Sequence, residues 1–398
     1  MTFKNAFIPY STYWSTPFAR WQGSLSDQHS MKLAAETAKT YLQGRDITAN
    51  AFDGLVLGMT VPQHQSFYGA PWMSGMLGAP EITGPTIAQA CATSVRMIAT
   101  SATEIEAGQR TSILNIACDR TSNGAHIYYP APKGIGGMGV SENIVFDSFN
   151  HDPFAKNPMI QTAENVAART GISKGAQDAI ALIRHEQYQM ALADDRAFQK
   201  RYMVPVELKR GRKVIGTLEA DEGIHPTNAE GLAKLRPVLP EGSVSFGSQT
   251  HPADGNAGIV VATEEQAAQM SADASIKIQI LAYGEARVEK GFMPMAVVPA
   301  AYKALERSGI SIQECGAVKT HNPFAVNDAY FCNKTGLDPQ KMNRYGSPLI
   351  YGHPQAPTGL RAIIELIEEL VISGGGYGLF SGCAAGDSAM ALVLKVDG

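Results

Sequence analysis

Apolar and polar positions along the chain alternate in blocks that predict strands and helices in turn. Continuous apolar runs at 53–59 and 112–118 are typical of strands buried on both faces. Between these runs, residues 95–105 repeat apolar side chains at the spacing of one helical face, and residues 28–44 form another amphipathic run. Strands that alternate with helices predict an α/β fold with a largely parallel sheet.

The pattern changes between residues 119 and 243. Glycine and proline are dense at 129–139, and two helical runs follow at 162–169 and 174–194. We interpret the whole region as an insertion carried by the first sheet. Its basic cluster, Lys209–Lys213, is interpreted first as a solvated turn and second as a seat for a nucleotide phosphate, in which Arg212 would take part.

The second half repeats the first in outline. A strand at 257–263 is followed by a helix and connector at 264–273, which we take as the domain boundary. We therefore predict an N-terminal domain at 1–265, with the insertion inside it, and a C-terminal domain at 274–398. The elements expected in the latter are strands at 276–283 and 316–320, helices at 299–308 and 358–372, and an edge-closing strand pair at 377–383 and 389–396.

Composition narrows the class of protein. The chain has 398 residues, 44% hydrophobic content and a net charge of −4, which is too mild for a nucleic-acid or membrane-surface role. The start has no apolar segment typical of a secretory signal, and no run is long enough to span a bilayer. The cysteines at 91, 118, 315, 332 and 383 form no C-x-x-C pair. This spacing predicts a reduced, cytoplasmic protein without a zinc site or a disulfide framework.

Cys91 is the first candidate for chemistry. It lies where an apolar, turn-bounded segment meets the predicted helix at 95–105. Unpaired N–H groups at a helix N-terminus favour negative charge, so we expect a lowered pKa and a nucleophilic thiolate. The alternative, a buried structural cysteine, stays open on this segment alone.

Three polar segments of the second half lie at the ends of predicted elements. They are 320–325 with His321, 351–354 with His353, and 381–386 with Cys383. Taken singly, a histidine before or near proline is more often a turn residue, and Cys383 fits strand packing. Together with Cys91, they supply a thiol pair and two imidazoles, which are the groups of covalent acyl transfer.

These segments also match a known pattern, because the chain resembles the thiolase family over nearly its whole length. The motifs that carry the resemblance are Ser15–Arg20 with Gly23, Gln161–Ala167 with Gly171–Ser173 and Gln177-Asp178, Asp254–Ala257, and Asn343 and Gly346 with Gly352-His353-Pro354, Gly359 and Arg361. The resemblance implies a five-layered αβαβα fold of two similar halves, with an inserted loop domain. It also implies at least a homodimer, with coenzyme A as cosubstrate and no metal or other cofactor.

The resemblance implies roles for the candidate residues. Cys91 would accept the acyl group from a coenzyme A thioester, and His353 would take the thiol proton. Cys383 would be the second acid/base. One oxyanion hole would use His321 with His353, either directly or through a bound water. The other would use the backbone N–H groups of Cys91 and Ala385.

Other residues are assigned to substrate or coenzyme A binding. Thr250 and His251 align with a pantetheine-contacting stretch of the family, and Phe324 lies in the motif after His321. This motif, His-Asn-Pro-Phe, differs from the common Asn-Glu-Ala-Phe and is similar to the sterol carrier protein-type thiolases at its histidine. Ala385 replaces a glycine, and its N–H can still donate in the oxyanion hole if the backbone there does not require glycine. Together, these departures from the family pattern leave acyl specificity open. The aromatic stretch 67–73 suggests an atypical, bulky acyl group, or a packed loop or dimer contact.

Three functions follow. The first is a thiolase that interconverts acyl-CoA plus acetyl-CoA with 3-oxoacyl-CoA plus CoA. The second is a thiolase-fold lyase of retro-aldol type, against which Cys91, His353 and Cys383 argue. The third is a subunit that needs a small acyl-CoA-binding zinc-ribbon partner.

Overall fold

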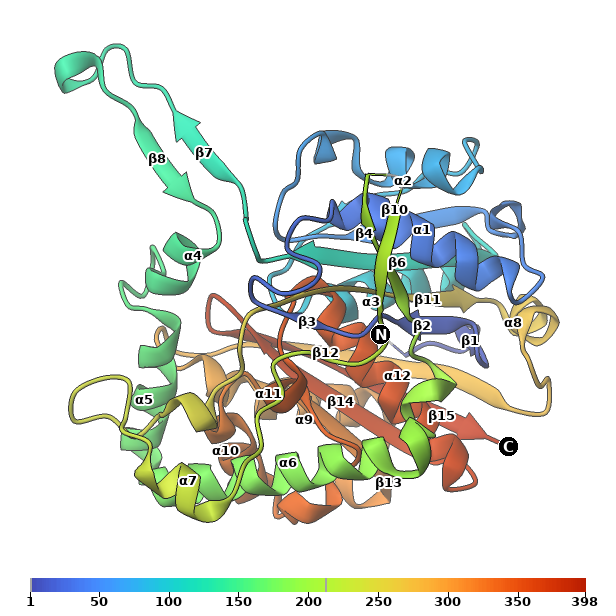
Figure 1. The fold of residues 1–398 in the computed structure, drawn as a ribbon. Helices are drawn as coiled ribbons and strands as arrows, with labels where there is room; N and C mark the ends of the chain where they lie inside the picture. Colours follow the sequence, from blue (N-terminus) through green and yellow to red (C-terminus); the bar gives the residue numbers. More distant parts are fainter. Residues whose placement is uncertain (1, 212) are drawn as a thin grey trace.

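A computed structural model describes residues 2–211 and 213–398 (Figure 1). Its centre is an eleven-stranded mixed sheet whose main path runs β13-β14-β15-β12-β1-β11-β6-β4-β5. The short strand β1 (Phe7–Pro9) joins the two halves, because Phe7 pairs with Ala262 on one side and with Gln279 on the other. The halves therefore share one continuous hydrogen-bonded sheet.

The first half holds one end of this sheet. Its further strands are β2 (Tyr13–Ser15), β3 (Ala19–Arg20), β4 (Gly54–Gly58), β5 (Thr86–Ile87), β6 (Ser112–Arg120) and β11 (Ala253–Ala262). Its helices are α1 (Ser30–Gln43), α2 (Gly69–Leu77), α3 (Thr93–Glu106) and the connecting α8 (Glu264–Met270). Strand β4 runs parallel to β5 and β6, whereas β11 is antiparallel to β6.

The second half holds the other end. Its strands are β12 (Lys277–Arg287), β13 (Cys315–His321), β14 (Gly376–Ala384) and β15 (Ser388–Asp397). Its helices are α9 (Val297–Ser308), α10 (Ala325–Thr335), α11 (Pro348–Tyr351) and α12 (Ala356–Ile372). Only β13 and β14 are parallel here, and β15 is antiparallel to both β12 and β14.

The residues between β6 and β11 form the insertion, which lies outside the eleven-stranded sheet. It comprises β7 (His126–Tyr129), β8 (Val140–Asn143), α4 (Phe146–Asn150), α5 (Met159–Thr170), α6 (Lys174–Arg196), β9 (Val206–Arg210), β10 (Lys213–Leu218) and α7 (Ala229–Lys234). The β7–β8 hairpin reaches away from the rest of the chain (Figure 1). Helices α5 and α6 instead share a core with α9 and α10 of the second half.

The structure has five layers, as expected for the thiolase fold. They are the outer helices of the first half, the strands of the first half, helices α3 and α12, the strands of the second half, and the outer helices of the second half. Helices α3 and α12 lie in the middle layer, where Val95, Ile98, Leu360 and Ile363 belong to one buried core. Helices α1 and α2 cover the outer face of the first half, and α9 and α10 cover that of the second. Along β15, Leu392 and Leu394 face the middle core. Val393 faces the outer core. Such strands read as continuous apolar runs because both of their faces are buried.

Two expectations about the sheet were wrong. It is mixed rather than largely parallel, because β11 and β15 return antiparallel to their neighbours. Strands β14 and β15 are not an edge pair either, since β13 lies outside them. An apolar run shows that a strand is buried but does not show the direction of its neighbour. Among the described residues, no helix is long and apolar enough to cross a bilayer.

Candidate active site

Cys91 lies in a tight loop directly before α3. The backbone of Ala90 has a φ of 44°, a conformation that costs free energy in a non-glycine residue and is concentrated at functional sites. The Thr93 hydroxyl holds this loop, because it accepts from the Gln89 N–H at 2.8 Å and donates to the Ala90 carbonyl at 2.6 Å. The start of α3 therefore fixes where the Cys91 thiol points.

His353 approaches Cys91 from the loop between α11 and α12. Its Nε2 lies 3.2 Å from the Cys91 sulfur, and its Nδ1 lies 2.6 Å from the hydroxyl of Thr358. Burial and the neighbouring His321 hold the pKa of His353 well below its usual value, so the imidazole is neutral. A neutral ring that donates from Nδ1 to Thr358 presents a lone pair to the thiol, and can take its proton.

His321 ends strand β13 and stands beside His353. The two ring centroids are 4.2 Å apart, with the planes inclined by 42°. Burial lowers the pKa of His321 to about 3. Neither ring nitrogen has a hydrogen-bond partner among the described residues. The side chain thus offers one N–H donor and one lone pair that no protein group uses.

Cys383 and Ala385 come from the end of β14 and the turn after it. The Asn327 side-chain amide donates to the Cys383 sulfur at 3.2 Å. Burial raises the pKa of the Cys383 thiol well above its usual value, and the nearby Cys91 adds to this effect. The backbone N–H of Ala385 points at the Cys91 sulfur. Four separate segments therefore meet around one sulfur atom.

The expected lowered pKa of Cys91 was wrong. Burial raises it to about 11, and the N–H groups of Ala385 and Cys91 itself offset only part of that shift. The charge of Asp119 raises it further. A thiol at a helix N-terminus keeps its proton when its surroundings exclude water. Cys91 therefore needs an adjacent base, and His353 lies in the position of one.

Gln355 is a partner of Cys91 that the sequence did not reveal. Its side-chain oxygen lies 3.3 Å from the Cys91 sulfur, and its backbone has a φ of 63°. The next residue, Ala356, donates its N–H to the buried carboxylate of Asp119 at 2.9 Å. The only feature of the sequence that could have indicated this contact is that Gln355 directly follows His353-Pro354. A glutamine there has no periodicity that would mark it.

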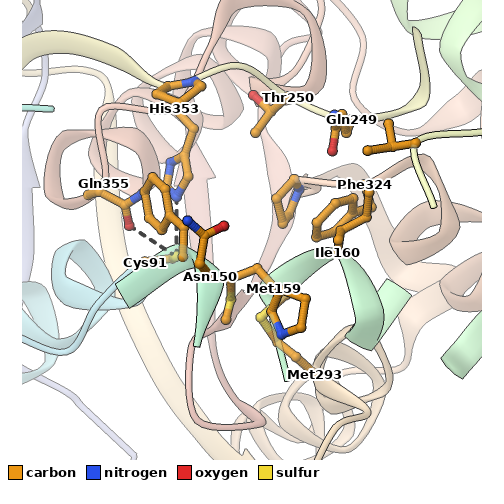
Figure 2. A pocket seen from close by; sticks show the side chains of 15 residues that line it. Cys91, Asn150, Met159, Ile160, Gln249, Thr250, Met293, Phe324, His353 and Gln355 are labelled. Carbon is orange, nitrogen blue, oxygen red and sulfur yellow. Dashed lines mark hydrogen bonds between the residues drawn. The ribbon is translucent and has the colours of Figure 1, made fainter. Parts of the chain in front are cut away.

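A cavity of about 280 Å³ opens above this cluster (Figure 2). Cys91, His353 and Gln355 form one end, and most of the remaining wall is apolar. The apolar side chains come mainly from the insertion and the second half: Phe149, Pro158, Met159, Ile160, Val238, Met293, Pro323 and Phe324. The insertion and the second half thus enclose a space in front of the thiol.

The predicted binding residues divide into two groups. Thr250 and Phe324 line the cavity, although the Thr250 hydroxyl already donates to the Pro348 carbonyl at 2.5 Å. His251 does not line it, because its ring packs against Gly223 and Gly352. Its contribution is the backbone carbonyl, which accepts from the His353 N–H at 2.9 Å. The His251 side chain therefore does not face the cavity.

Two other candidates lie elsewhere. Arg212 falls outside the described residues, and none of its described neighbours in 209–213 lines the cavity. Lys209 instead pairs with Glu36 at 3.0 Å. The aromatic stretch does not reach the cavity either, since Phe67 and Tyr68 are exposed on the surface and Met73 is buried in the outer core around α1. The stretch therefore gives no support to a bulky acyl group.

Comparison with known proteins decides the family. Residues 13–265 match the thiolase N-terminal domain, and residues 274–396 match the thiolase C-terminal domain. The chain belongs to the thiolase family. It is 28% identical over 397 residues to a beta-ketoadipyl-CoA thiolase of Acinetobacter baylyi, covering 96% of this chain and 97% of that relative. The mitochondrial 3-ketoacyl-CoA thiolase of Bos taurus is also 28% identical, over 386 residues, with 96% of each chain covered.

Solved structures agree with this assignment. Human mitochondrial 3-ketoacyl-CoA thiolase in complex with CoA superposes on this thiolase with a TM-score of 0.90, 25% identity and 99% of each chain covered. The acetyl-CoA acetyltransferase of Bacillus anthracis gives a TM-score of 0.89 at the same identity. The protein is accordingly an acyltransferase that acts on acyl-CoA thioesters.

Proposed function

We propose that this thiolase cleaves or forms 3-oxoacyl-CoA through an acyl-cysteine intermediate on Cys91. The observation that carries the proposal is the contact between Cys91 and His353 at one end of the cavity, with 3.2 Å between sulfur and nitrogen. A buried thiol with a raised pKa is a poor nucleophile unless a base removes its proton during attack. The neutral His353 supplies that base.

In the first step, the Cys91 sulfur attacks the thioester or 3-oxo carbonyl carbon while its proton passes to His353 Nε2. The carbonyl oxygen gains negative charge, and the N–H groups of Cys91 and Ala385 would donate to it. Collapse of this intermediate leaves the acyl group on Cys91 and releases coenzyme A, or the enolate of the shortened acyl-CoA. The leaving group takes up one proton, so the protein returns to its starting charge.

In the second step of condensation, the Cys383 thiolate would take a proton from the α-carbon of the acyl-CoA. The resulting enolate would attack the acyl carbonyl carbon, so that a C–C bond forms, the C–S bond to Cys91 breaks, and the Cys91 sulfur takes up the proton that Cys383 removed. In cleavage, coenzyme A would attack the acyl group on Cys91 instead, and its thiol proton would pass to the released Cys91 sulfur.

The raised pKa of the Cys383 thiol suits its role in condensation, because a strongly basic thiolate is needed to remove a weakly acidic α-proton. The thioester oxygen becomes enolate-like and needs donors. The unpartnered ring N–H of His321 is one such donor, and it remains neutral at working pH.

The cavity supports an apolar acyl group larger than acetyl. Its wall beyond the thiol is built from phenylalanine, methionine, isoleucine and valine side chains. Burying the methylenes of an acyl chain against such a wall contributes about 0.8 kcal/mol per group. We therefore propose a medium-length or branched apolar chain as the preferred acyl group.

A cleavage assay tests this function. Purified protein is incubated with coenzyme A and 3-oxoacyl-CoA thioesters of increasing chain length, and the products are separated by mass. We expect thiolysis that Cys91→Ala abolishes. Cys383→Ala should block deuterium exchange at the α-carbon of acetyl-CoA but still allow acyl transfer to Cys91. Cleavage of a 3-hydroxyacyl-CoA without coenzyme A consumption, retained in Cys91→Ala, would instead establish the lyase.

A further inference from the structure

Three metal-ligating side chains converge at the thiol from distant parts of the sequence. The sulfur of Cys91 and one ring nitrogen each of His321 and His353 lie within 4.8 Å of one another. The residues are supplied by the loop before α3, the end of β13 and the loop before α12. The cysteine spacing predicted a protein without a zinc site, because no C-x-x-C pair is present. This group does not depend on such a pair, because the fold assembles it from distant residues.

Of the three side chains, His321 has the fewest interactions that acyl transfer would explain. Its ring is fully buried, and both of its nitrogens are without a hydrogen-bond partner among the described residues. A buried polar group without a partner is rare and needs an explanation. One N–H can serve a substrate oxygen, but the other nitrogen then still holds a lone pair. A water molecule or a cation can use that lone pair, and histidine is the commonest metal ligand in proteins.

His353 has the arrangement of a metal-bound histidine. Its Nδ1 contacts the Thr358 hydroxyl at 2.6 Å, which orients the ring and leaves Nε2 facing the Cys91 sulfur at 3.2 Å. Such a hydrogen bond on the far nitrogen is usual for histidine ligands, because it fixes the tautomer and the ring plane. In a tetrahedral zinc site, ligand bonds of about 2.0–2.3 Å hold neighbouring ligand atoms roughly 3.3–3.6 Å apart. Small side-chain rotations therefore suffice.

The surroundings also favour a thiophilic cation. The Cys91–His353 end faces the cavity, so the fourth ligand position is open to water or to the side-chain oxygen of Gln355. Burial raises the pKa of the nearby Asp119 carboxyl to about 7, and in its ionised form it adds negative charge next to the Cys91 thiol. That charge would offset the excess positive charge of a divalent ion bound by one thiolate. One sulfur and two imidazole nitrogens suit zinc, cobalt or cadmium, and they do not suit magnesium or calcium.

We propose that Cys91, His321 and His353 form a binding site for one thiophilic divalent cation of the zinc class, which blocks the acyl-accepting thiol. Binding replaces the Cys91 S–H bond by a metal–sulfur bond and releases one proton to solvent, with no change of oxidation state. The bound ion occupies both the nucleophile and its base, so the loaded protein cannot accept an acyl group. Metal binding itself requires only the three side chains, whereas the block of acylation rests on the proposed function.

Cobalt titration tests the site without any activity assay. Full-length protein is treated with a chelator, desalted under reducing conditions and titrated with Co²⁺ in an absorption cell. We expect one Co²⁺ per chain and a thiolate-to-cobalt charge-transfer band that Zn²⁺ abolishes stoichiometrically and Mg²⁺ leaves unchanged. Cys91→Ser, His321→Asn and His353→Asn should each lose the band, with thermal unfolding curves that confirm folded protein. Cys315→Ser, at another partly exposed cysteine, is the matched control and should retain it.

Alkylation of Cys91 gives a second readout. Iodoacetamide labelling followed by peptide mapping should show that Zn²⁺ protects Cys91 in the unmodified protein, and that a chelator restores labelling. In His321→Asn, the same Zn²⁺ concentration should give at least a tenfold weaker protection. Absence of the band in the unmodified protein, or a band of unchanged intensity in Cys91→Ser or His321→Asn, would overturn the proposal.

Discussion

The Nε2 atom of His353 lies 3.2 Å from the Cys91 sulfur, and the same ring is held from behind by the Thr358 hydroxyl at 2.6 Å. The thiol, the imidazole and the hydroxyl thus form a chain across three segments of the fold. Burial raises the pKa of Cys91 and lowers that of His353, so both groups are neutral before reaction. Proton transfer within the pair then occurs only when the sulfur attacks.

The pH dependence of acylation follows from these pKa shifts. A lowered pKa keeps His353 in its basic form at pH values where an ordinary histidine, with a pKa of about 6.5, would be protonated. We expect the rate of Cys91 acylation to stay constant between about pH 8 and pH 6. Stopped-flow acylation across this range measures it. An acid limb centred near the ordinary histidine value would contradict the proposed state of the pair.

Removing the Thr358 hydroxyl should slow acylation. Thr358→Val keeps the shape of the side chain but leaves His353 Nδ1 without its partner. We expect the rate to fall about 10–100-fold, part of the 10²–10⁴-fold that a positioned general base contributes. Thr358→Ser retains the hydroxyl and is the control, with a rate within a few-fold of the unmodified protein. Equal losses in both variants would mean that packing, not the hydrogen bond, matters.

Gln355 should assist the thiolate. The single S–H proton of Cys91 cannot satisfy both His353 and Gln355, so the glutamine amide can turn and donate to the sulfur as charge forms. A hydrogen bond to a charged group contributes about 1.5–3 kcal/mol, so we expect Gln355→Leu to lower kcat/KM about 10–100-fold.

Gln355→Gly separates this effect from backbone strain, because glycine adopts the φ of 63° without cost. The glycine variant should be as slow as the leucine variant while unfolding at the same or a higher urea concentration. Unchanged kcat/KM in both variants would remove Gln355 from the reaction.

Arg361 should be a main anchor of the insertion. Its guanidinium is fully buried on α12, bonds both oxygens of Asp221 at 2.6 and 2.8 Å, and stacks on Tyr351. Arg361→Met leaves the Asp221 carboxylate buried without its cation, so we expect urea unfolding to show a loss of about 3–5 kcal/mol. The double variant with Asp221→Asn should recover part of it. A single variant of unchanged stability would show that the pair is dispensable.

The sequence predicts much of this structure where one periodicity dominates. Residues 95–105 and 358–372 lie on helices α3 and α12 because their apolar faces meet in the middle layer. The sequence could not predict the direction of β11 and β15 relative to their neighbours, because a continuous apolar run looks the same in a parallel and in an antiparallel strand. The short strand β1, which joins the halves through Phe7, is too brief to show a pattern.

The site divides in the same way. Cys91, His321, His353 and Cys383 stood at the ends of predicted elements, where polar residues interrupt apolar runs. The raised pKa of Cys91 could not be read from its helix, because it depends on burial by the other segments. Gln355 contacts Cys91 because it directly follows Pro354, and His251 holds His353 through its backbone carbonyl. Neither contact could be predicted from the type of side chain.

Intact-protein mass spectrometry tests the central claim most directly. The protein is mixed with a panel of acyl-CoAs, quenched in acid and mapped by peptide. We predict a mass gain of one acyl group on Cys91 that Cys91→Ala abolishes, with the strongest labelling from apolar chains longer than acetyl. No adduct from any donor, or an adduct on another residue that persists in Cys91→Ala, would contradict the acyl-cysteine mechanism.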